Sequence, residues 1–337
     1  MFSIYLFIIL LNFFFFIFYK KISKLYNLFD YPDNNRKIHK QPIPLLGGFF
    51  LVSNLFFILI YVNFSYNLIN SNLFNNIQSY NLFFFITFLF YFIGFIDDKY
   101  QINHNIKFVL SVILIILTFY LDKDLLLKKL EFSFLKSAID LGSFSYFFTI
   151  LCFLLFINAY NMLDGINGQA TCYALFIFFL LFSKNILVSF IGVLFIPLLF
   201  FLILNFQNKS FLGDSGTLSL GYMISYIFIK LHNTEKIFLA DEIFLIMSIP
   251  GYELLRLAIK RIFNKKHPFL PDNNHIHHLI GQKCKFIVKF FIVQLILIFP
   301  YLFYIVSNHF LISFLISLFL YIASITFFYK RNIEHVK

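Results

Sequence analysis

Residues 83–108 read FFFITFLFYFIGFIDDKYQINHNIKF, and this stretch decides the class of fold. Fourteen uncharged residues, Phe83 to Ile96, lead directly into two adjacent acids, Asp97 and Asp98. A helix needs about 20 apolar residues to cross the hydrocarbon core of a bilayer. Acids cost roughly 2.5–3.5 kcal/mol each at the centre of such a helix, so the pair belongs near its end. The stretch predicts a membrane helix that delivers two carboxylates to one membrane face.

The remainder of the chain repeats this apolar pattern. Of the 337 residues, 60% are hydrophobic and 13% are charged, whereas a soluble domain is nearer half apolar and about a quarter charged. The apolar residues form blocks of about 16–21 residues, which are long enough to span a bilayer. We therefore expect an all-α, polytopic membrane protein with about eleven transmembrane helices. The expected spans are 2–19, 45–62, 81–96, 106–121, 144–160, 170–183, 186–204, 215–231, 242–258, 286–306 and 309–329.

The distribution of positive charge predicts the orientation. The net charge of +11 comes from short loops between the spans, which argues against a basic face for nucleic acid. When loop 20–44 is placed inside and the sides alternate, 20 of the 27 Lys and Arg residues fall inside. Because cytoplasmic loops carry the excess of positive charge, the N-terminus is expected outside and the C-terminus inside.

Dense polar segments lie on only one side of this predicted topology. They are 29–48, 97–107, 158–169, 205–217 and 256–283, and all of them fall inside. A conduction path would need polar or ionisable groups at mid-depth, and a transporter often shows paired broken helices. The one-sided placement therefore favours an enzyme that works at one membrane face over a solute transporter or a lipid flippase.

The acids within these segments have a plain explanation and a functional one. Asp97 and Asp98 repel each other and the partial negative charge of the helix end. They are either a solvated pair beside Lys99 or the neighbours of a bound cation. Asn158, Asn161 and Asp164 follow at intervals of three, which puts them on one helix face. They either cap a helix exit or offer amide and carboxylate oxygens to a hard cation or a nucleotide.

Asp214 lies within FLGDSGT (211–217), just before an expected span. A helix N-cap alone would explain an aspartate there. A helix N-terminus also binds anions such as phosphate. Mg²⁺ could bridge the Asp214 carboxylate and that phosphate, because Mg²⁺ takes one or two protein carboxylates plus phosphate oxygens.

His275, His277 and His278 lie in PDNNHIHHLI (271–280), in the same loop region as Arg256. Surface histidines without a function are one interpretation. A zinc site is disfavoured, because no Cys or Glu cluster completes a tetrahedral set. The basic surroundings favour contact with phosphate. In RKIHKQPIPLLGG (36–48), the positive charges serve either as a topological anchor or as a site for an anionic lipid headgroup.

This inventory of acids, amides and cations suits phosphoryl chemistry on anionic substrates with a divalent metal ion. Five motifs, in order, resemble the polyprenyl-phosphate N-acetylhexosamine-1-phosphate transferases, which begin O-antigen, enterobacterial common antigen and wall teichoic acid synthesis. The motifs are DYPDNNRKIHKQPIPLLGG, GFIDDKYQINHNIKF, NAYNMLDGINGQ, FLGDSGTLSLGY and PDNNHIHHLI. The resemblance covers roughly residues 20–285. It implies one integral membrane transferase domain over residues 1–337, with core motifs in 29–283.

The resemblance also implies the reaction and its setting. A UDP-N-acetylhexosamine donates sugar-1-phosphate to undecaprenyl phosphate and UMP leaves, at the cytoplasmic face of the bacterial inner membrane. GlcNAc is the default sugar, with QuiNAc and FucNAc open. The expected cofactor is Mg²⁺, with Mn²⁺ as an alternative. The glycan that is initiated and the oligomeric state are open, and a homodimer is one option.

The family analogy supports the site residues as a set, and their individual roles are our assignment. Asp214 and Asn161 are assigned to the metal ion, and Asp97 to orienting or deprotonating the lipid phosphate. Asp98 and Asp164 support the metal ion and the uridine side. The phosphate-stabilising set is His275, His277, His278, Arg256 and Lys99, and the further donor-binding candidates are Asn158 and Asn205.

The sequence departs from the family pattern at three positions. Asn167 and Gln169 stand in DGINGQ where many members read DGIDGL, and Glu253 in IPGYELLR replaces the usual aspartate. These differences bear on sugar or nucleotide preference. Phospho-MurNAc-pentapeptide transfer is the alternative reaction, although that enzyme's loop before the Gly-Gly pair and its run of three histidines differ. A two-step route through an aspartyl-phosphate is an alternative to direct displacement.

Overall fold

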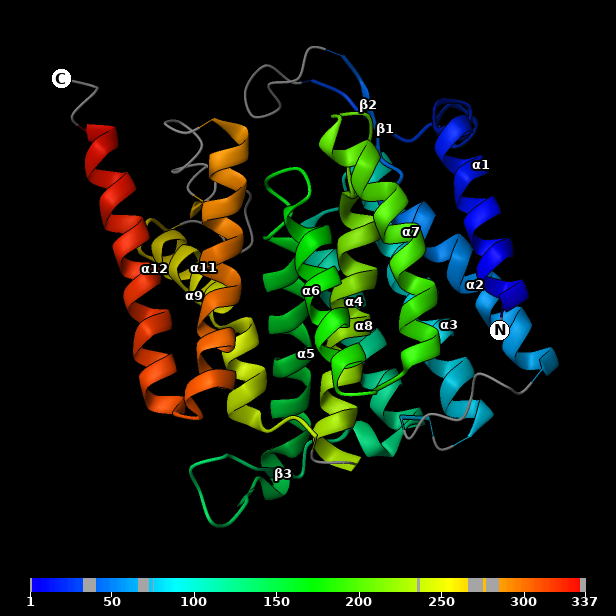
Figure 1. Ribbon diagram of the computed structural model, residues 1–337. Helices are drawn as coiled ribbons and strands as arrows, with labels where there is room; N and C mark the ends of the chain where they lie inside the picture. Colours follow the sequence, from blue (N-terminus) through cyan, green and yellow to red (C-terminus); the bar gives the residue numbers. More distant parts are fainter. Residues whose placement is uncertain are drawn as a thin grey trace.

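The computed structural model describes residues 2–32, 41–65, 73–74, 76–234, 237–265, 275–276 and 285–333. Within these ranges the chain forms a bundle of long α-helices that run up and down (Figure 1). The helices are α1 (Phe2–Tyr26), α2 (Gly47–Ser65), α3 (Ile77–Tyr100), α4 (His104–Leu121), α5 (Ser145–Asn161), α6 (Gln169–Ser183), α7 (Val188–Phe206), α8 (Gly213–Thr234), α9 (Ala240–Phe263), α11 (Phe286–Ser307) and α12 (Phe310–Ile333). Each predicted span coincides with one of them, which confirms the all-α polytopic architecture.

Extended structure among the described residues consists of two short antiparallel pairs and an isolated parallel bridge between Leu45 and Phe211. Strand β1 (Phe29–Asp30) pairs with β2 (Ile43–Pro44), and β3 (Lys129–Leu130) pairs with β4 (Ile139–Asp140). Two 3-10 turns, η1 (Lys123–Leu125) and η2 (Gly142–Phe144), flank the second pair. The β1–β2 pair and the β3–β4 pair lie at opposite ends of the bundle (Figure 1). We call the end that carries β1 and β2 the site end.

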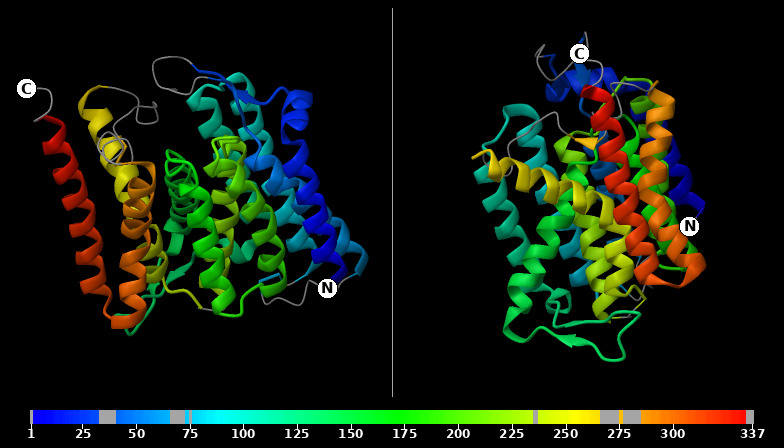
Figure 2. Two further views of the ribbon diagram at one scale, coloured as in Figure 1. Left: turned by 45° about the horizontal axis from the view of Figure 1, so that its top comes forward. Right: turned by 90° about the vertical axis from the view of Figure 1, so that its left-hand side faces the viewer.

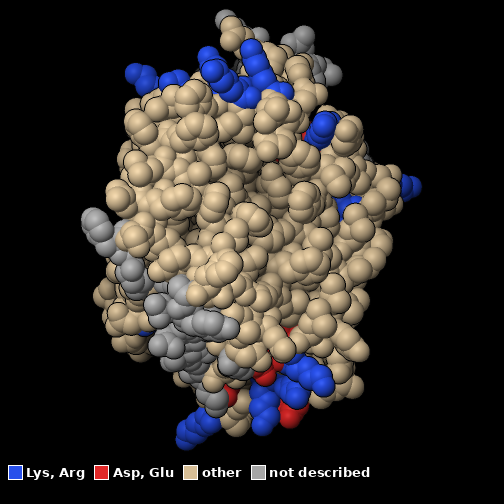
Figure 3. Space-filling view, turned by 90° about the vertical axis from the view of Figure 1, so that its right-hand side faces the viewer, with Lys and Arg blue, Asp and Glu red and all other residues tan. Residues whose placement is uncertain are grey.

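Eight of the described helices are long and apolar enough to cross a membrane. Helix α6, at 15 residues, is shorter, and α8 and α9 are more polar than the other helices. The space-filling view shows a broad uncharged band between charged groups at the two ends, as expected of a bilayer-spanning surface (Figure 3).

Helix α8 is the centre of the bundle, which explains its polarity. Every residue from Ser215 to His232 is buried. Protein rather than lipid surrounds this helix, so its small and polar residues face neighbouring helices. Small residues let helix backbones approach closely inside a membrane. A Cβ on Gly94 of α3 would lie 2.4 Å from the backbone of Asp214, and one on Gly221 would lie 3.0 Å from the Cα of Ile157 in α5.

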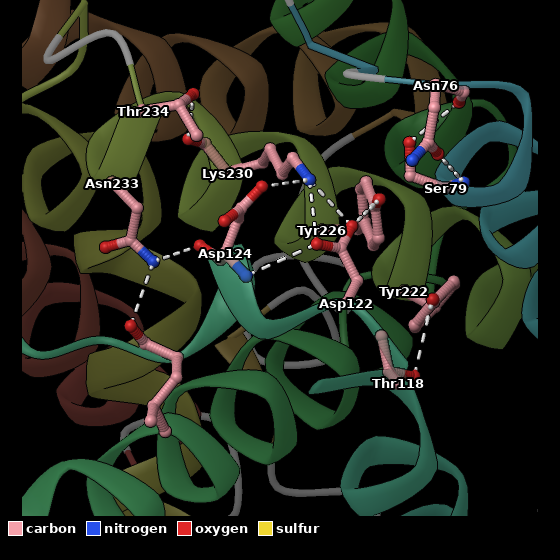
Figure 4. Close-up of polar contacts among 11 residues, drawn as sticks. Asn76, Ser79, Thr118, Asp122, Asp124, Tyr222, Tyr226, Lys230, Asn233 and Thr234 are labelled. Atoms are coloured by element: carbon pink, nitrogen blue, oxygen red, sulfur yellow. Dashed lines mark hydrogen bonds and ion pairs between the residues drawn. The ribbon is translucent and has the colours of Figure 1, made fainter. Parts of the chain in front are cut away.

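A buried ion pair ties α8 to the end of α4 far from the site (Figure 4). The Lys230 side chain has no exposed surface, and its Nζ lies 2.7 and 2.8 Å from the two carboxylate oxygens of Asp122. Tyr226 donates a hydrogen bond to the same carboxylate (2.7 Å). The more exposed Asp124 accepts a longer hydrogen bond from the same Lys230 ammonium (3.4 Å). Lys230 thus lies inside the protein, although its sequence position suggested only a charge in an outer loop.

Helix α9 contains Pro250 and its second half leans away from the bundle axis (Figure 2). Proline removes one backbone hydrogen bond and commonly kinks a helix. The leaning half exposes Leu255, Ile259 and Ile262, each more than 50% accessible.

Candidate active site

Four helix ends meet at the site end of the bundle (Figure 1). These are the C-terminal ends of α3 and α5 and the N-terminal ends of α4 and α8. An antiparallel bundle brings the end of one helix beside the start of the next, so residues far apart in sequence converge. The structure thereby brings Asp97, Asp98, Asp164 and Asp214 into one region.

Asp98 joins α3 to the first turn of α8. Its Oδ1 accepts the backbone N–H of Asp214 (2.7 Å) and its Oδ2 accepts that of Ser215 (3.1 Å). These amides have no intrahelical partner at a helix N-terminus, and a carboxylate there also complements the helix dipole. Gly213 makes this approach possible, because its φ of +74° is unfavourable for other residues and a Cβ would lie 2.6 Å from the carboxylate. Asp98 therefore fixes the position of the following acid, Asp214.

Lys107 in the first turn of α4 connects the two other carboxylates. Its Nζ lies 2.9 Å from Oδ2 of Asp97 and also contacts Oδ2 of Asp214. The second oxygen of Asp97 accepts the backbone N–H of Ile102 (2.7 Å). All three side chains are partly buried, with 16% of Lys107, 16% of Asp97 and 30% of Asp214 exposed. The ammonium group shows that the space between these carboxylates stabilises positive charge.

Residues at the end of α5 complete the acidic region. Asn161 accepts a hydrogen bond on its Oδ1 from Thr217 of α8 (2.6 Å). Burial and the nearby charge of Asp214 raise the pKa of Asp164 to about 7, although a backbone hydrogen bond from Gly213 acts in the opposite direction. Asn158 turns its amide nitrogen back to the carbonyl of Leu154 within its own helix (2.8 Å). Helix α5 ends at Asn161, so Asp164 lies in the turn that follows and not on the helix face that the sequence predicted. Asn161 and Asp164 both lie against the start of α8.

Asn205 connects two loops by hydrogen bonds. It is buried, and its side chain accepts from the N–H of Gly168 and donates to the carbonyl of Ser210 (2.7 Å). Asn167 donates to Oδ1 of Asn208 (2.5 Å) on the same side. The structure thus places the donor-binding candidate Asn205 beneath the loop that carries Asp164, with both ends of its amide engaged.

The other predicted site residues lie around this region. Lys99 is exposed at the end of α3, with its ammonium 5.3 Å from the ring centroid of Tyr100. Arg256 of α9 pairs with Glu253 (2.8 Å). His275 lies beside the same glutamate, with Nδ1 3.8 Å from Oε1. His277 and His278 lie outside the described residues.

Lys107 is the functional candidate that sequence reasoning missed, because it was counted only among the inside charges. A signal was present: a lysine in the first turn of a helix opposes the helix dipole unless an anion lies nearby. The DD pair ten residues earlier supplies that anion.

The donor set around Asp214 fits Mg²⁺ by its chemistry. Carboxylate and amide oxygens are hard ligands, and Mg²⁺ needs only one or two protein carboxylates because substrate phosphates and water complete its shell. Within the described part of the chain there is no group of three or more His, Cys, Asp or Glu side chains poised to hold a metal ion. The residues therefore fit an ion shared with a phosphate-bearing substrate rather than a cage built by protein alone.

The fold and site define a polytopic membrane protein with an acidic, amide-lined centre at one end of its bundle. Residues 80–232 match the family model described as glycosyl transferase family 4. The chain is 29% identical to a probable undecaprenyl-phosphate N-acetylglucosaminyl 1-phosphate transferase of Bacillus subtilis, over 77% of this chain and 71% of that protein. It is 28% identical to the Escherichia coli K12 undecaprenyl-phosphate alpha-N-acetylglucosaminyl 1-phosphate transferase, over 82% and 74%. The corresponding protein of Yersinia pestis is 27% identical over 77% and 71%. These similarities agree with the resemblance to the polyprenyl-phosphate N-acetylhexosamine-1-phosphate transferases that the sequence motifs indicate.

Proposed function

We propose that this protein transfers N-acetylglucosamine-1-phosphate from its UDP-sugar to undecaprenyl phosphate, forming a lipid-linked diphosphate sugar and releasing UMP. The observation that carries the proposal is the convergence of Asp97, Asp98 and Asp164 around Asp214, with Lys107 between Asp97 and Asp214. The chain is also similar to enzymes named for this transfer. The same placement supports an active site at the cytoplasmic face of a bacterial inner membrane, since positive loop charge gathers on that side.

The chemical step is a displacement at phosphorus. An oxygen of the lipid phosphate forms a bond to the phosphorus that carries the sugar. The bond from that phosphorus to the bridging oxygen of the diphosphate breaks, and its electron pair leaves with UMP. A phosphate monoester has a second pKa near 6, so the acceptor is mostly dianionic at neutral pH and needs little help from a base. The main barrier is the approach of two anions.

The protein's own residues meet this electrostatic requirement. Lys107, which contacts Asp97 and Asp214, lies where it can pair with a donor phosphate oxygen. Asp97 orients the acceptor phosphate. Asp98 accepts two backbone N–H groups of the first turn of α8 and so holds Asp214 in place. His275 can donate a hydrogen bond to phosphate at the edge of the site, where Arg256 pairs with the neighbouring Glu253. Mg²⁺, when bound by Asp214 with Asn161 nearby, supplies further neutralisation of diphosphate charge.

The test is UMP release by the purified protein in lipid nanodiscs with undecaprenyl phosphate, Mg²⁺ and a panel of UDP-sugars. We expect turnover with UDP-GlcNAc, loss of turnover with EDTA, and recovery with Mg²⁺. Asp97→Asn and Asp214→Asn should each lower turnover by at least about 100-fold, as is typical when a group that stabilises transition-state charge is removed. Full activity in both variants would refute the proposal.

A second experiment separates direct displacement from a covalent route. We expect no phosphorylated protein when the enzyme is incubated with UDP-GlcNAc labelled at its sugar-linked phosphate and no lipid. A trapped, hydroxylamine-labile phosphoryl-sugar adduct on an aspartate would replace direct displacement with the two-step mechanism.

A further inference from the structure

A buried cluster joins α9 to α12, the helix at the edge of the bundle (Figure 1). Glu253 of α9 is only 5% exposed. Tyr321 of α12 donates a hydrogen bond to its Oε2 (2.6 Å). Arg256 donates to the same oxygen from Nε (3.2 Å) and to Oε1 from Nη2 (2.8 Å). Arg256 also donates to the Tyr321 hydroxyl (2.9 Å), so the three side chains form a closed set.

The same carboxylate holds a separate part of the chain. Oε1 of Glu253 accepts the backbone N–H of Ile276 (2.8 Å), and Nδ1 of His275 lies 3.8 Å from that oxygen. Because this hydrogen bond is to a backbone amide, it does not depend on the side chain at position 276. It holds the backbone directly after His275 in place.

Ile276 also lies against the acidic region. Its side chain is 5% exposed and lines a small cavity together with Met162, Leu163 and Gln169. Met162 and Leu163 directly precede Asp164. The tether to Glu253 therefore sets the position of the His275–Ile276 segment relative to the loop that carries Asp164.

The energetics give Tyr321 a part in this tether. An unpaired carboxylate buried in a membrane protein is costly. Arg256 and Tyr321 satisfy the lone pairs of Glu253 that the Ile276 amide does not use. Loss of the Tyr321 hydroxyl would leave Oε2 with one donor and free the carboxylate to turn.

We propose that Glu253, held by Arg256 and Tyr321, is a positioning residue that fixes the His275–Ile276 segment beside the acidic site. This inference rests on the proposed function, because it assigns the segment a part in transfer. It also assigns α12 an effect on turnover through Tyr321, which contacts Glu253 and not the aspartates of the acidic site.

The test compares two hydroxyl deletions at the same helix interface. Tyr321→Phe removes a donor to Glu253. Tyr252→Phe removes a hydroxyl that contacts Ser317 of α12 (3.0 Å), and its ring lies 5.5 Å from that of Tyr321. Tyr321→Phe loses two hydrogen bonds between α9 and α12, one to Glu253 and one from Arg256, whereas Tyr252→Phe loses one. Tyr252→Phe therefore controls for the loss of a hydroxyl at this helix interface. Glu253→Gln and Glu253→Asp complete the series.

Two quantities are measured in nanodiscs: hydrogen–deuterium exchange of the peptide that contains Ile276, and kcat and KM for UDP-GlcNAc. We expect Tyr321→Phe to exchange faster in that peptide and to lose about tenfold in kcat, the scale of one hydrogen bond to a charged group. Tyr252→Phe should match the wild type in both. Glu253→Gln should lose more than Tyr321→Phe, and Glu253→Asp, which keeps the charge, should recover part of the loss.

The inference is overturned if Tyr321→Phe and Tyr252→Phe have the same exchange and the same kcat. It is also overturned if kcat falls in Tyr321→Phe while exchange of the Ile276 peptide is unchanged. Failure of the proposed function is distinguishable, because the wild type would then release no UMP from any UDP-sugar. The exchange difference between the two tyrosine variants would still decide the existence of the tether.

Discussion

Asp98→Asn is expected to destabilise the protein by releasing the first turn of α8. The carboxylate accepts two backbone amides, at 2.7 and 3.1 Å. An asparagine keeps one oxygen acceptor and turns an NH₂ group toward the other amide. Loss of one hydrogen bond to a charged group costs about 1.5–3 kcal/mol, and the unsatisfied buried donor adds about 1–3 kcal/mol. We expect a total of about 3–5 kcal/mol.

The assay is thermal unfolding followed by circular dichroism, since the chain has no tryptophan for fluorescence. At roughly 2 °C per kcal/mol for a chain of this size, Tm should fall by about 6–10 °C. Turnover should fall as well, because Asp214 follows the released turn. Asp97→Asn is the matched control: it should lose turnover with a smaller change in Tm, because its partner Lys107 keeps Asp214.

The reasoning would be refuted by an Asp98→Asn protein with wild-type Tm and a selectively raised Mg²⁺ requirement. That result would make Asp98 a metal ligand rather than a cap for α8.

Three further predictions concern stability. Lys230→Met should lower the free energy of unfolding by about 3–5 kcal/mol, because it leaves the buried carboxylate of Asp122 without its cation. The double variant with Asp122→Asn should recover most of this stability. Equal Tm values for the single and the double variant would contradict the prediction. Gly94→Ala should destabilise by at least about 1–3 kcal/mol through overlap with the α8 backbone, whereas Gly251→Ala, which has no atom within 4 Å of the new Cβ, should be neutral in the same thermal assay. The pKa of Asp164 is raised from 3.8 to about 7 in the folded protein. In EDTA the Tm of the wild type should therefore fall as pH rises from about 4 to about 7, and the Tm of Asp164→Asn should change less over that range. Parallel Tm profiles of the two proteins would exclude this carboxyl group as the cause.

The sequence predicted the helices well because the driving force is local. Each apolar block must satisfy its own backbone hydrogen bonds in lipid, so block length alone predicts a helix. Helix ends were less predictable. The first helix was expected to end at residue 19 and ends at Tyr26, because a polar, amphipathic turn continues it beyond the apolar block.

The site was predictable only as a collection of residue types. The acids were identified because carboxylates are costly near a bilayer and their segments all fall on one side. Their partners were not, because pairing depends on which helix ends meet. The contacts of Asp98 with the start of α8 and of Lys107 with Asp214 join residues that are 116 and 107 positions apart. A hydropathy pattern carries no information on such distances.

The buried polarity of α8 has a consequence for biogenesis. A helix that carries Lys230, Asp214 and several serines and glycines has little tendency to leave a translocation channel for lipid by itself. Helices α3, α4 and α5 are synthesised earlier and supply its carboxylates and its close-packed surfaces. We therefore expect α8 to integrate only against these preceding segments, so that the acids meet as a by-product of ordered insertion into the membrane.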